Sequence, residues 1–212
     1  MFVLGLTGSI GMGKTAAAKM LRRMGLPLHD ADRAVHRLLA KGGAAVAAVE
    51  AAFPGVAVDG AVDRERLAVR VFEDPAALER LEEILHPAVR RTTRAFLGRH
   101  ARAGRPLVVL DIPLLFEAGG EALCDAVVVV TAPAFVQRAR VMGRRGMTPA
   151  RFQAILANQM PDREKRRRAD FVVKTGLSKA AALRQLRAII KLLRRWPGRY
   201  RRARANPRRI HA

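Results

Sequence analysis

A glycine-rich segment near the N-terminus constrains the fold more than any other feature of the sequence. Residues 8–15 read GSIGMGKT and match the phosphate-binding pattern G-x-x-x-x-G-K-[ST] at every fixed position. The apolar run 2–7 precedes this segment and predicts a buried strand, while residues 15–24 predict a helix that Gly25 ends. Strand, glycine loop and helix in this order predict an α/β fold in which the loop wraps around a phosphate group.

Each part of this loop has a predicted chemical role. The backbone N–H groups and the helix N-terminus would bind phosphate oxygens. Lys14 would reach the β- and γ-phosphates, and the Thr15 hydroxyl would bind Mg²⁺. We therefore predict ATP as co-substrate and Mg²⁺ as cofactor, with the ATP-binding residues Gly8, Gly11, Met12, Gly13, Lys14, Thr15 and Ala16.

Length and composition limit the number of domains and the compartment that this chain suits. A chain of 212 residues has room for one domain with a small insert and buries a core without disulfides. Its single cysteine, Cys124, suits a reducing compartment, and neither a secretory leader nor a membrane-spanning run is visible, so we expect a soluble cytoplasmic protein. The net charge of +22 is concentrated late: from residue 163 onward, 18 Lys or Arg residues accompany Glu164 and Asp170.

An acidic pair follows the second predicted strand. Residues 26–29 predict that strand, and Asp30 and Asp32 come directly after it. Open α/β sheets bind ligands at the carboxyl ends of their strands, so this pair would face the phosphate loop if the first two strands are neighbours. Asp32 is also well placed to cap a helix over 33–41. Both interpretations of Asp32 stay open at this point.

A second acid ends a run that predicts a fully buried strand. Residues 107–110 are continuously apolar and precede Asp111, which has the form of the acid that helps to hold Mg²⁺ in phosphate-loop enzymes. The segment IPLLFE, residues 112–117, follows at the expected ligand-binding edge. Its bulky apolar residues would either line a pocket or belong to the ordinary core.

The middle of the chain, residues 44–103, predicts helices and no strand. Helices are expected over 44–53 and 64–72, the second capped by Asp63, and a further helix starts at 74–75. Pro87 is expected to interrupt that helix, which resumes to residue 102. His86 would be a satisfied structural histidine, and Arg90 would face an anionic ligand or water.

The last third predicts two more strands, at 125–130 and 169–173, and a final helix from the Ser178 cap to about residue 195. Between the strands lie two helices, one ended by Gly146 and one running from Thr148 to Gln159. Arg140 and Arg144 share a face of the first. These arginines fit either a lid that closes over ATP or a solvated basic face. The tail, 197–212, is basic and predicted to be disordered.

In combination, these segments resemble the dephospho-coenzyme A kinase family. The resemblance covers about residues 2–195 and rests on motifs in the family's order. They are residues 5–15, 30–32, Leu85-His86-Pro87, 111–117, Gln137 with Arg138, Arg140 and Arg144, Gln159, and 169–170. Met12 and Ala16 stand where the family more often has small or hydroxyl residues. Thr175 stands where it usually has an Asn, so a side-chain contact to adenine there is in question.

The resemblance implies an ATP-dependent transfer of the γ-phosphoryl group to the ribose 3′-hydroxyl of dephospho-CoA, the last step of CoA synthesis. It implies a parallel five-stranded sheet flanked by helices in a single domain, 1–196, with core segments 1–31, 105–139 and 169–196. A helical CoA-side insert over 32–104 and a lid over 140–168 complete this domain. The implied catalytic residues are Asp32, Lys14, Arg140 and Arg144; the metal ligands are Thr15 and Asp111; the substrate side comprises Asp32, His86, Arg90, Pro113, Leu114, Leu115, Phe116 and Glu117.

Two other functions compete with this one. Another small-molecule kinase, for a nucleoside or nucleotide, would share the phosphate loop, but segments 85–87 and 113–117 argue against it. A nucleic-acid-binding ATPase would explain the charge, yet aromatic residues that stack on bases make up only 5% of the chain. We therefore expect dephospho-CoA as partner and at most nonspecific contact between the basic tail and nucleic acid.

Overall fold

The computed structural model describes residues 1–71 and 74–195. The predicted disorder of the basic tail 197–212 therefore lies outside the described residues. The chain divides into two compact units. One comprises Met1–Leu28 with the chain from His100 onward, and the other comprises His29–Arg99.

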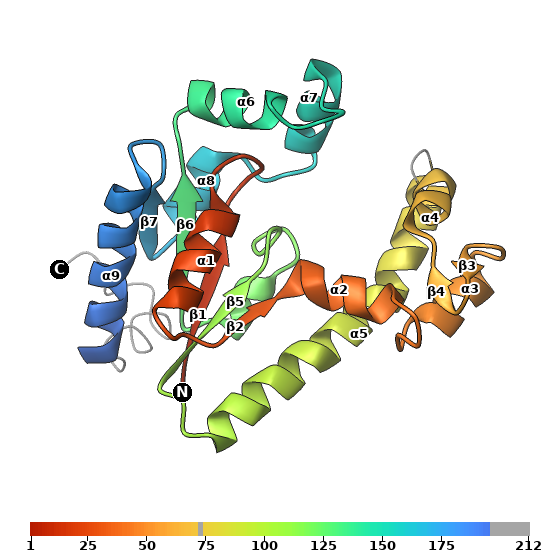
Figure 1. The fold of residues 1–212 in the computed structure, drawn as a ribbon, viewed down its shortest axis with the longest axis horizontal. Helices are drawn as coiled ribbons and strands as arrows, with labels where there is room; N and C mark the ends of the chain where they lie inside the picture. Colours follow the sequence, from red (N-terminus) through yellow and green to blue (C-terminus); the bar gives the residue numbers. More distant parts are fainter. Residues whose placement is uncertain (72–73, 196–212) are drawn as a thin grey trace. The chain divides into compact units, whose positions relative to one another are not determined.

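A five-stranded sheet forms the centre of the fold, as predicted (Figure 1). Its strands, in chain order, are β1 (Phe2–Thr7), β2 (Leu28–Asp30), β5 (Leu107–Asp111), β6 (Ala126–Thr131) and β7 (Phe171–Lys174). Their spatial order is β2-β5-β1-β6-β7, and β1 pairs in parallel with both β5 and β6. β6 in turn pairs in parallel with β7. The first two strands of the chain, β1 and β2, are not neighbours, because β5 lies between them. The condition under which the acidic pair was expected to face the phosphate loop is therefore not met.

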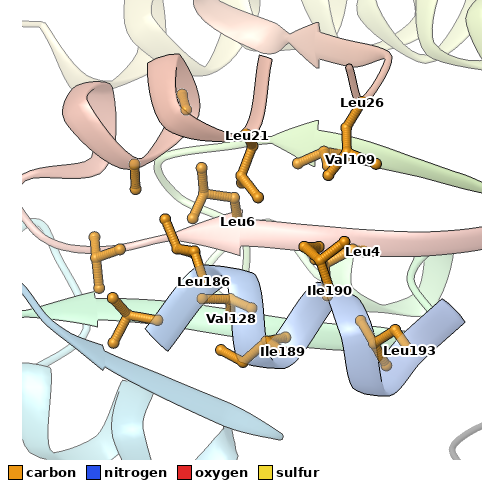
Figure 2. Packing of buried hydrophobic residues seen from close by; sticks show 14 of the residues in the cluster. Leu4, Leu6, Leu21, Leu26, Val109, Val128, Leu186, Ile189, Ile190 and Leu193 are labelled. Atoms are coloured by element: carbon orange, nitrogen blue, oxygen red, sulfur yellow. The ribbon is translucent and has the colours of Figure 1, made fainter. Parts of the chain in front are cut away.

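Two helices pack on the sheet and close its main core. They are α1 (Lys14–Arg23) and α9 (Lys179–Arg195), which lie beside each other in Figure 1. Figure 2 shows Leu21 of α1 and Leu186 and Ile190 of α9 directed toward the strand residues Leu4 and Leu6. Each such aliphatic side chain contributes about 1.5–3 kcal/mol when it is fully buried. The predicted cap of α9 is confirmed, since Ser178 Oγ accepts from Ala181 N at 3.0 Å.

The remaining helices of this unit follow β5 and β6. A 3-10 helix spans Gly120–Leu123, and α6 (Ala134–Met142) and α7 (Pro149–Ala157) correspond to the two predicted arginine-bearing helices. Thr148, at which this second helix was predicted to begin, caps α7, since its hydroxyl accepts from Arg151 N at 3.2 Å. A further helix, α8 (Asp162–Arg168), was not predicted. Its sequence, DREKRRR, has no apolar residue from which a helical period can be read.

The second unit is mostly helical. It contains α2 (Ala31–Leu39), α3 (Val46–Ala52), α4 (Arg64–Val71) and most of α5 (Pro75–Arg102), packed around a cluster that includes Val49, Val56 and Leu67. Asp63 caps α4 as predicted, its Oδ1 accepting from Glu65 N at 2.9 Å.

Two expectations for this unit were wrong. It does contain strands, the antiparallel pair β3 (Ala57–Val58) and β4 (Ala61–Val62). The turn between them has Asp59 at φ 51° and Gly60 at φ 79°, the left-handed conformations of a tight hairpin. Pro87 does not interrupt the helix, because the 28-residue helix α5 runs through this position. A proline removes one helical hydrogen bond, and packing of Leu81 and Ala88 on either side of it keeps the helix on the core.

No helix in the described part of the chain combines the length and the apolar character that spanning a membrane requires.

Candidate nucleotide-binding site

The glycine loop links β1 to α1 and leaves backbone donors at the start of the helix. Gly11 and Gly13 have φ of 76° and 90°, conformations that favour glycine because a Cβ would be strained. Gly13 is also the N-cap of α1. Within the described residues, this helix end has no side-chain cap and no acidic residue in its first turn. Its N–H groups and its dipole are therefore suited to an anion.

Gly8, at the start of the loop, is required for a different reason. A Cβ at this position would lie 2.5 Å from Val130 Cγ2 and 2.7 Å from the Val130 carbonyl oxygen on β6. The loop leaves β1 in direct contact with the neighbouring strand, and any side chain here would push the two apart.

Lys14 forms an ion pair with Asp111, the last residue of β5. Lys14 Nζ lies 2.8 Å from Asp111 Oδ1, and the two side chains are 16% and 4% exposed. The parallel register that pairs Leu6 with Asp111 brings the end of β5 beside the start of the loop. The two sequence-predicted residues, 97 positions apart in the chain, thus share one sheet edge.

Side chains from outside the motif donate hydrogen bonds to the backbone carbonyl groups of the loop. Gln137 Nε2 donates to Ile10 O at 2.8 Å, and Arg140 donates to Gly11 O at 3.3 Å. Thr175 Oγ1 donates to Met12 O at 2.7 Å. Arg140 also donates to the Thr175 hydroxyl at 3.1 Å and to the Thr175 carbonyl at 2.7 Å. Three consecutive carbonyl groups of the loop therefore have a side-chain donor each.

Of the two predicted catalytic arginines, Arg140 contacts the loop, whereas Arg144 is exposed just beyond the end of α6. Gln159, two residues after the end of α7, accepts from the loop N–H of Ile10 at 3.0 Å. Helix α6 and the segment that follows α7 thus both contact the phosphate loop through polar side chains.

The segment after Asp111 divides between surface and core. Leu115 and Phe116 are 0% and 5% exposed and belong to the interior, whereas Leu114 is 41% exposed. Of the two interpretations of this segment, core packing applies to Leu115 and Phe116. The Pro113 carbonyl accepts from Thr7 Oγ1 at 2.8 Å, which fixes the segment to the end of β1.

Glu117 ends this segment in a buried ion pair that the sequence did not reveal. Lys165 of α8 is 0% exposed, and its Nζ lies 2.8 Å from Glu117 Oε1. Met160 N donates to the same oxygen at 2.9 Å. Burial alone raises the pKa of Glu117, but the hydrogen bond and charge of Lys165 and the backbone N–H groups of Glu117 and Met160 outweigh it and hold the pKa below its usual range. Nothing in the run of basic residues 165–168 distinguished Lys165 from its arginine neighbours.

A cavity of about 690 Å³ lies beside the loop. Met12 of the loop lines it, together with Pro133, Phe135, Asp162, Lys174 and Leu177. Phe135 and Leu177 are 75% and 79% exposed, so this cavity offers apolar surface to a ligand. The volume and the mixture of apolar and polar lining are typical of a small-molecule site.

The predicted residues of the second unit lie on its surface. Asp32 is exposed in the first turn of α2, and His86 and Arg90 are exposed on α5. The alternative role of Asp32 as a helix cap was wrong: Asp30 caps α2, its Oδ1 accepting from Arg33 N at 3.0 Å. The Asp32 carboxylate is therefore not required for the helix.

Sequence reasoning missed His29, which is buried next to this acidic pair. Its Nε2 lies 3.1 Å from Thr93 Oγ1, and its ring centroid lies 5.2 Å from that of Phe96. Burial lowers the pKa of His29, and the charge of Arg37 lowers it further against an opposing contribution from Asp30. The residue follows an apolar strand run, which is the one signal in the sequence that could have indicated its burial.

Two oxygen donors suit a magnesium ion at the loop. The Thr15 hydroxyl is on the exposed side of α1, and Asp111 supplies a carboxylate; both are hard ligands of the kind that Mg²⁺ prefers. Among residues 1–71 and 74–195, no three His, Cys, Asp or Glu side chains gather as a metal site.

Three features define the class of this protein. It has a parallel sheet, a glycine loop between the central strand and a helix, and a loop lysine paired with the acid of the adjacent strand. The protein is a P-loop nucleotide-binding protein.

Comparison with known proteins places the chain within this class. The family model described as CoaE, dephospho-CoA kinase, matches residues 2–179. A dephospho-CoA kinase of Paramagnetospirillum magneticum is 63% identical over 194 residues, which are 92% of either chain. One of Mesorhizobium japonicum is 59% identical over 92% of this chain and 98% of its own. The crystal structure of TT1252 from Thermus thermophilus has a TM-score of 0.78 at 37% identity, covering 91% of this chain and 97% of that one.

The chain belongs to the dephospho-CoA kinase family. Its reaction class, the ATP-dependent phosphorylation of dephospho-CoA in coenzyme A biosynthesis, follows from this membership. The resemblance seen in the sequence is confirmed.

Proposed function

We propose that this protein transfers the γ-phosphoryl group of ATP to the ribose 3′-hydroxyl of dephospho-CoA, with the residues assigned as follows. The observation that carries the proposal is the Lys14–Asp111 pair beside a glycine loop in a chain of this family. The loop N–H groups bind the phosphates, and the Lys14 ammonium neutralises charge that moves onto the β- and γ-phosphate oxygens.

Thr15 and Asp111 would hold Mg²⁺, and their oxygen donors fit this ion. When bound, Mg²⁺ would screen the phosphate oxygens and so ease the approach of a nucleophile. Lys14, whose Nζ now lies 2.8 Å from Asp111 Oδ1, would share its interaction between Asp111 and the nucleotide. Arg144 of the predicted lid, residues 140–168, would add positive charge as the phosphoryl group moves.

Asp32 would orient the acceptor hydroxyl and take its proton. The support is chemical: its carboxylate is exposed and, within the described residues, no hydrogen bond or cap engages it, because Asp30 fills the capping position. A positioned general base typically contributes about 10²–10⁴-fold to a rate. His86, Arg90 and the exposed parts of Pro113–Glu117, with the insert 32–104, would serve the CoA side.

The cavity lined by Met12, Pro133, Phe135 and Leu177 would hold the adenine of ATP. Its apolar residues suit a flat base, and Met12 joins it to the phosphate loop. We further propose a cytoplasmic location, which suits a chain whose single cysteine, Cys124, is buried.

The test is a coupled assay of ADP release with dephospho-CoA against a panel of nucleosides and nucleotides, with ³¹P NMR to locate the new phosphate. Turnover with dephospho-CoA and a signal from a ribose 3′-phosphate are expected. Turnover with a nucleoside and none with dephospho-CoA would refute the proposal.

The role of Asp32 is tested by Asp32→Asn beside the control Asp30→Asn. Asparagine caps helices as well as aspartate does, so the control keeps α2 and removes a neighbouring carboxylate. We expect Asp32→Asn to lower kcat by about 10²–10⁴-fold with ATP affinity little changed. Near-normal turnover in Asp32→Asn, or an equal loss in the control, would remove Asp32 from the mechanism.

A further inference from the structure

Three consecutive peptide carbonyls of the phosphate loop face side chains that lie far from the motif in the sequence. Gln137 and Arg140, from α6, donate to Ile10 O and Gly11 O, and Thr175, just after β7, donates to Met12 O. We call these three side chains the carbonyl clamp. None of the three belongs to the pattern that identifies the loop.

Thr175 is the residue on which the clamp converges. Its hydroxyl donates to Met12 O at 2.7 Å and accepts from Arg140 at 3.1 Å, while its own carbonyl accepts from Arg140 at 2.7 Å. A hydroxyl has one proton to donate. Two carbonyl oxygens lie within reach of this proton, Met12 O at 2.7 Å and Thr131 O at 3.3 Å, and the shorter contact with Met12 is the stronger. The Arg140 guanidinium is held between Thr175 and the loop.

The direction of these bonds matters for phosphate binding. A trans peptide unit is planar, so its N–H group points away from its C=O group. The hydrogen bonds from Gln137 to Ile10 O and from Thr175 to Met12 O therefore turn the N–H groups of Gly11 and Gly13 away from the clamp. A loop of this kind binds phosphate oxygens through such N–H groups.

Packing supports the same arrangement. A Cβ on Gly13 would lie 3.0 Å from Thr175 Oγ1 and 3.2 Å from its Cβ, so Thr175 sits directly against the last glycine of the loop. Gln137 is 7% exposed, so the first member of the clamp is screened from competing water. The clamp thus fixes the loop from two elements, α6 and the turn that follows β7.

We propose that Thr175, with Gln137 and Arg140, preorganises the phosphate loop, and that Thr175 acts as a positioning residue for the phosphates of the nucleotide and not as a contact to its base. The inference rests on the proposed function in one respect, that the loop binds ATP. In a loop without the clamp, the binding-competent conformation is only partly populated, and apparent affinity falls by that fraction.

The experiment compares Thr175→Val, which keeps the shape and removes the hydroxyl, with Thr175→Ser, which restores it. Thr92→Val is the matched control, since Thr92 Oγ1 also donates to a backbone carbonyl, that of Val89 at 2.8 Å, but does so within α5. Calorimetry of the full chain with Mg²⁺ measures binding of ATP and, separately, of inorganic triphosphate. Neither measurement needs dephospho-CoA, so the inference is tested even if that substrate is wrong.

We expect Thr175→Val to raise the Kd of ATP about tenfold, the ratio that corresponds to the loss of one hydrogen bond with its acceptor left unpaired. The Kd of triphosphate should rise by the same factor, Thr175→Ser should restore both, and Thr92→Val should leave both unchanged. Amide exchange at Gly11 and Gly13 should accelerate in Thr175→Val.

Two results would overturn the inference. A Kd for triphosphate that Thr175→Val leaves unchanged, while that of ATP rises, would make Thr175 a base contact. Wild-type affinity for both ligands in Thr175→Val would remove Thr175 from the site. Should Thr175→Val not fold, Thr175→Ala is measured in its place against the same predictions.

Discussion

Lys14 and Lys165 each hold an ammonium nitrogen 2.8 Å from a carboxylate oxygen, and their partners, Asp111 and Glu117, bound one short segment of the chain. The burial of the two pairs is reversed. In the first pair the acid is the buried member, at 4% against 16% for the lysine. In the second the lysine is completely buried, at 0%, and the acid is 19% exposed.

We call Lys14–Asp111 the working pair and Lys165–Glu117 the structural pair, after the roles that we propose for them. An ammonium that reaches solvent can exchange part of its interaction for an arriving phosphate, as the proposed role of Lys14 requires. An ammonium enclosed by protein has no such alternative, so Lys165 depends on Glu117 and on the Pro113 carbonyl 3.5 Å away. The distance within a pair is therefore a poor guide to its role, and the exposed fraction of the cation is a better one.

The largest expected effect breaks the structural pair. Glu117→Gln leaves the fully buried Lys165 without a countercharge and should lower the free energy of unfolding by about 3–5 kcal/mol, as measured by urea denaturation. The double variant Glu117→Gln with Lys165→Met should recover most of this loss, because no charge is then buried. A double variant no more stable than the single one would contradict the comparison.

Breaking the working pair should affect turnover instead. Lys14→Met removes the cation that serves the phosphates, and we expect kcat to fall by about 10²–10³-fold and the KM for ATP to rise. ADP release in the coupled assay measures both. Activity within tenfold of the wild type, in a variant whose circular dichroism is native, would show that Lys14 only balances Asp111.

Acidification should gradually remove the stabilisation that the structural pair gives, because it protonates Glu117. Because the pKa of Glu117 is lower in the folded chain than in the unfolded one, its ionised form stabilises the fold above the usual glutamate range. This stabilisation is lost as the pH falls through the native pKa. The difference in unfolding free energy between wild type and Glu117→Gln should therefore shrink on acidification from neutral pH. A constant difference across that range would mean that the charge of Glu117 does not matter.

The smallest change in unfolding free energy is expected at an exposed ion pair, which serves as a reference for the two buried pairs. Arg66 Nε lies 3.5 Å from Asp63 Oδ2, with side chains that are 59% and 36% exposed. Arg66→Met should change the unfolding free energy by less than about 1 kcal/mol, since solvent screens such a pair. A loss as large as that of Glu117→Gln in the same urea series would show that burial is not what distinguishes these pairs.

The features of the fold that the sequence predicted are those with a continuous local signal. The apolar runs of β1, β5 and β6, the glycine loop and the caps Asp63, Thr148 and Ser178 all lie where the pattern indicated. A proline in α5 was over-interpreted, because tertiary packing sustains a helix that local propensity would end. The hairpin of β3 and β4 was missed because strands of two residues have no readable period.

The site shows the same division. Lys14 and Asp111 were predictable because each ends or follows a buried strand, and parallel strands end at one edge. Lys165 was not, because it carries no motif and its partner lies far along the chain. Gln137 and Arg140 of the carbonyl clamp were identified by the family resemblance, but their contacts with the backbone of the loop were not, because these partners too lie far along the chain. Thr175 was noticed only as a departure from the family pattern, and its contacts with Met12 and Arg140 give that departure a physical meaning.

Gly8, finally, bears on whether this loop can be moved to another protein. Its missing side chain makes room for Val130 on a different strand. The φ angle of Gly8 is not positive, so the backbone conformation does not itself require glycine. If residues 8–15 were transplanted onto a new sheet, Gly8 would leave a gap, because the Val130 side chain that fills this space would be absent. The loop is thus portable only together with the strand beside it, and a graft that includes Val130 and its flanking residues should retain its shape better than the motif alone.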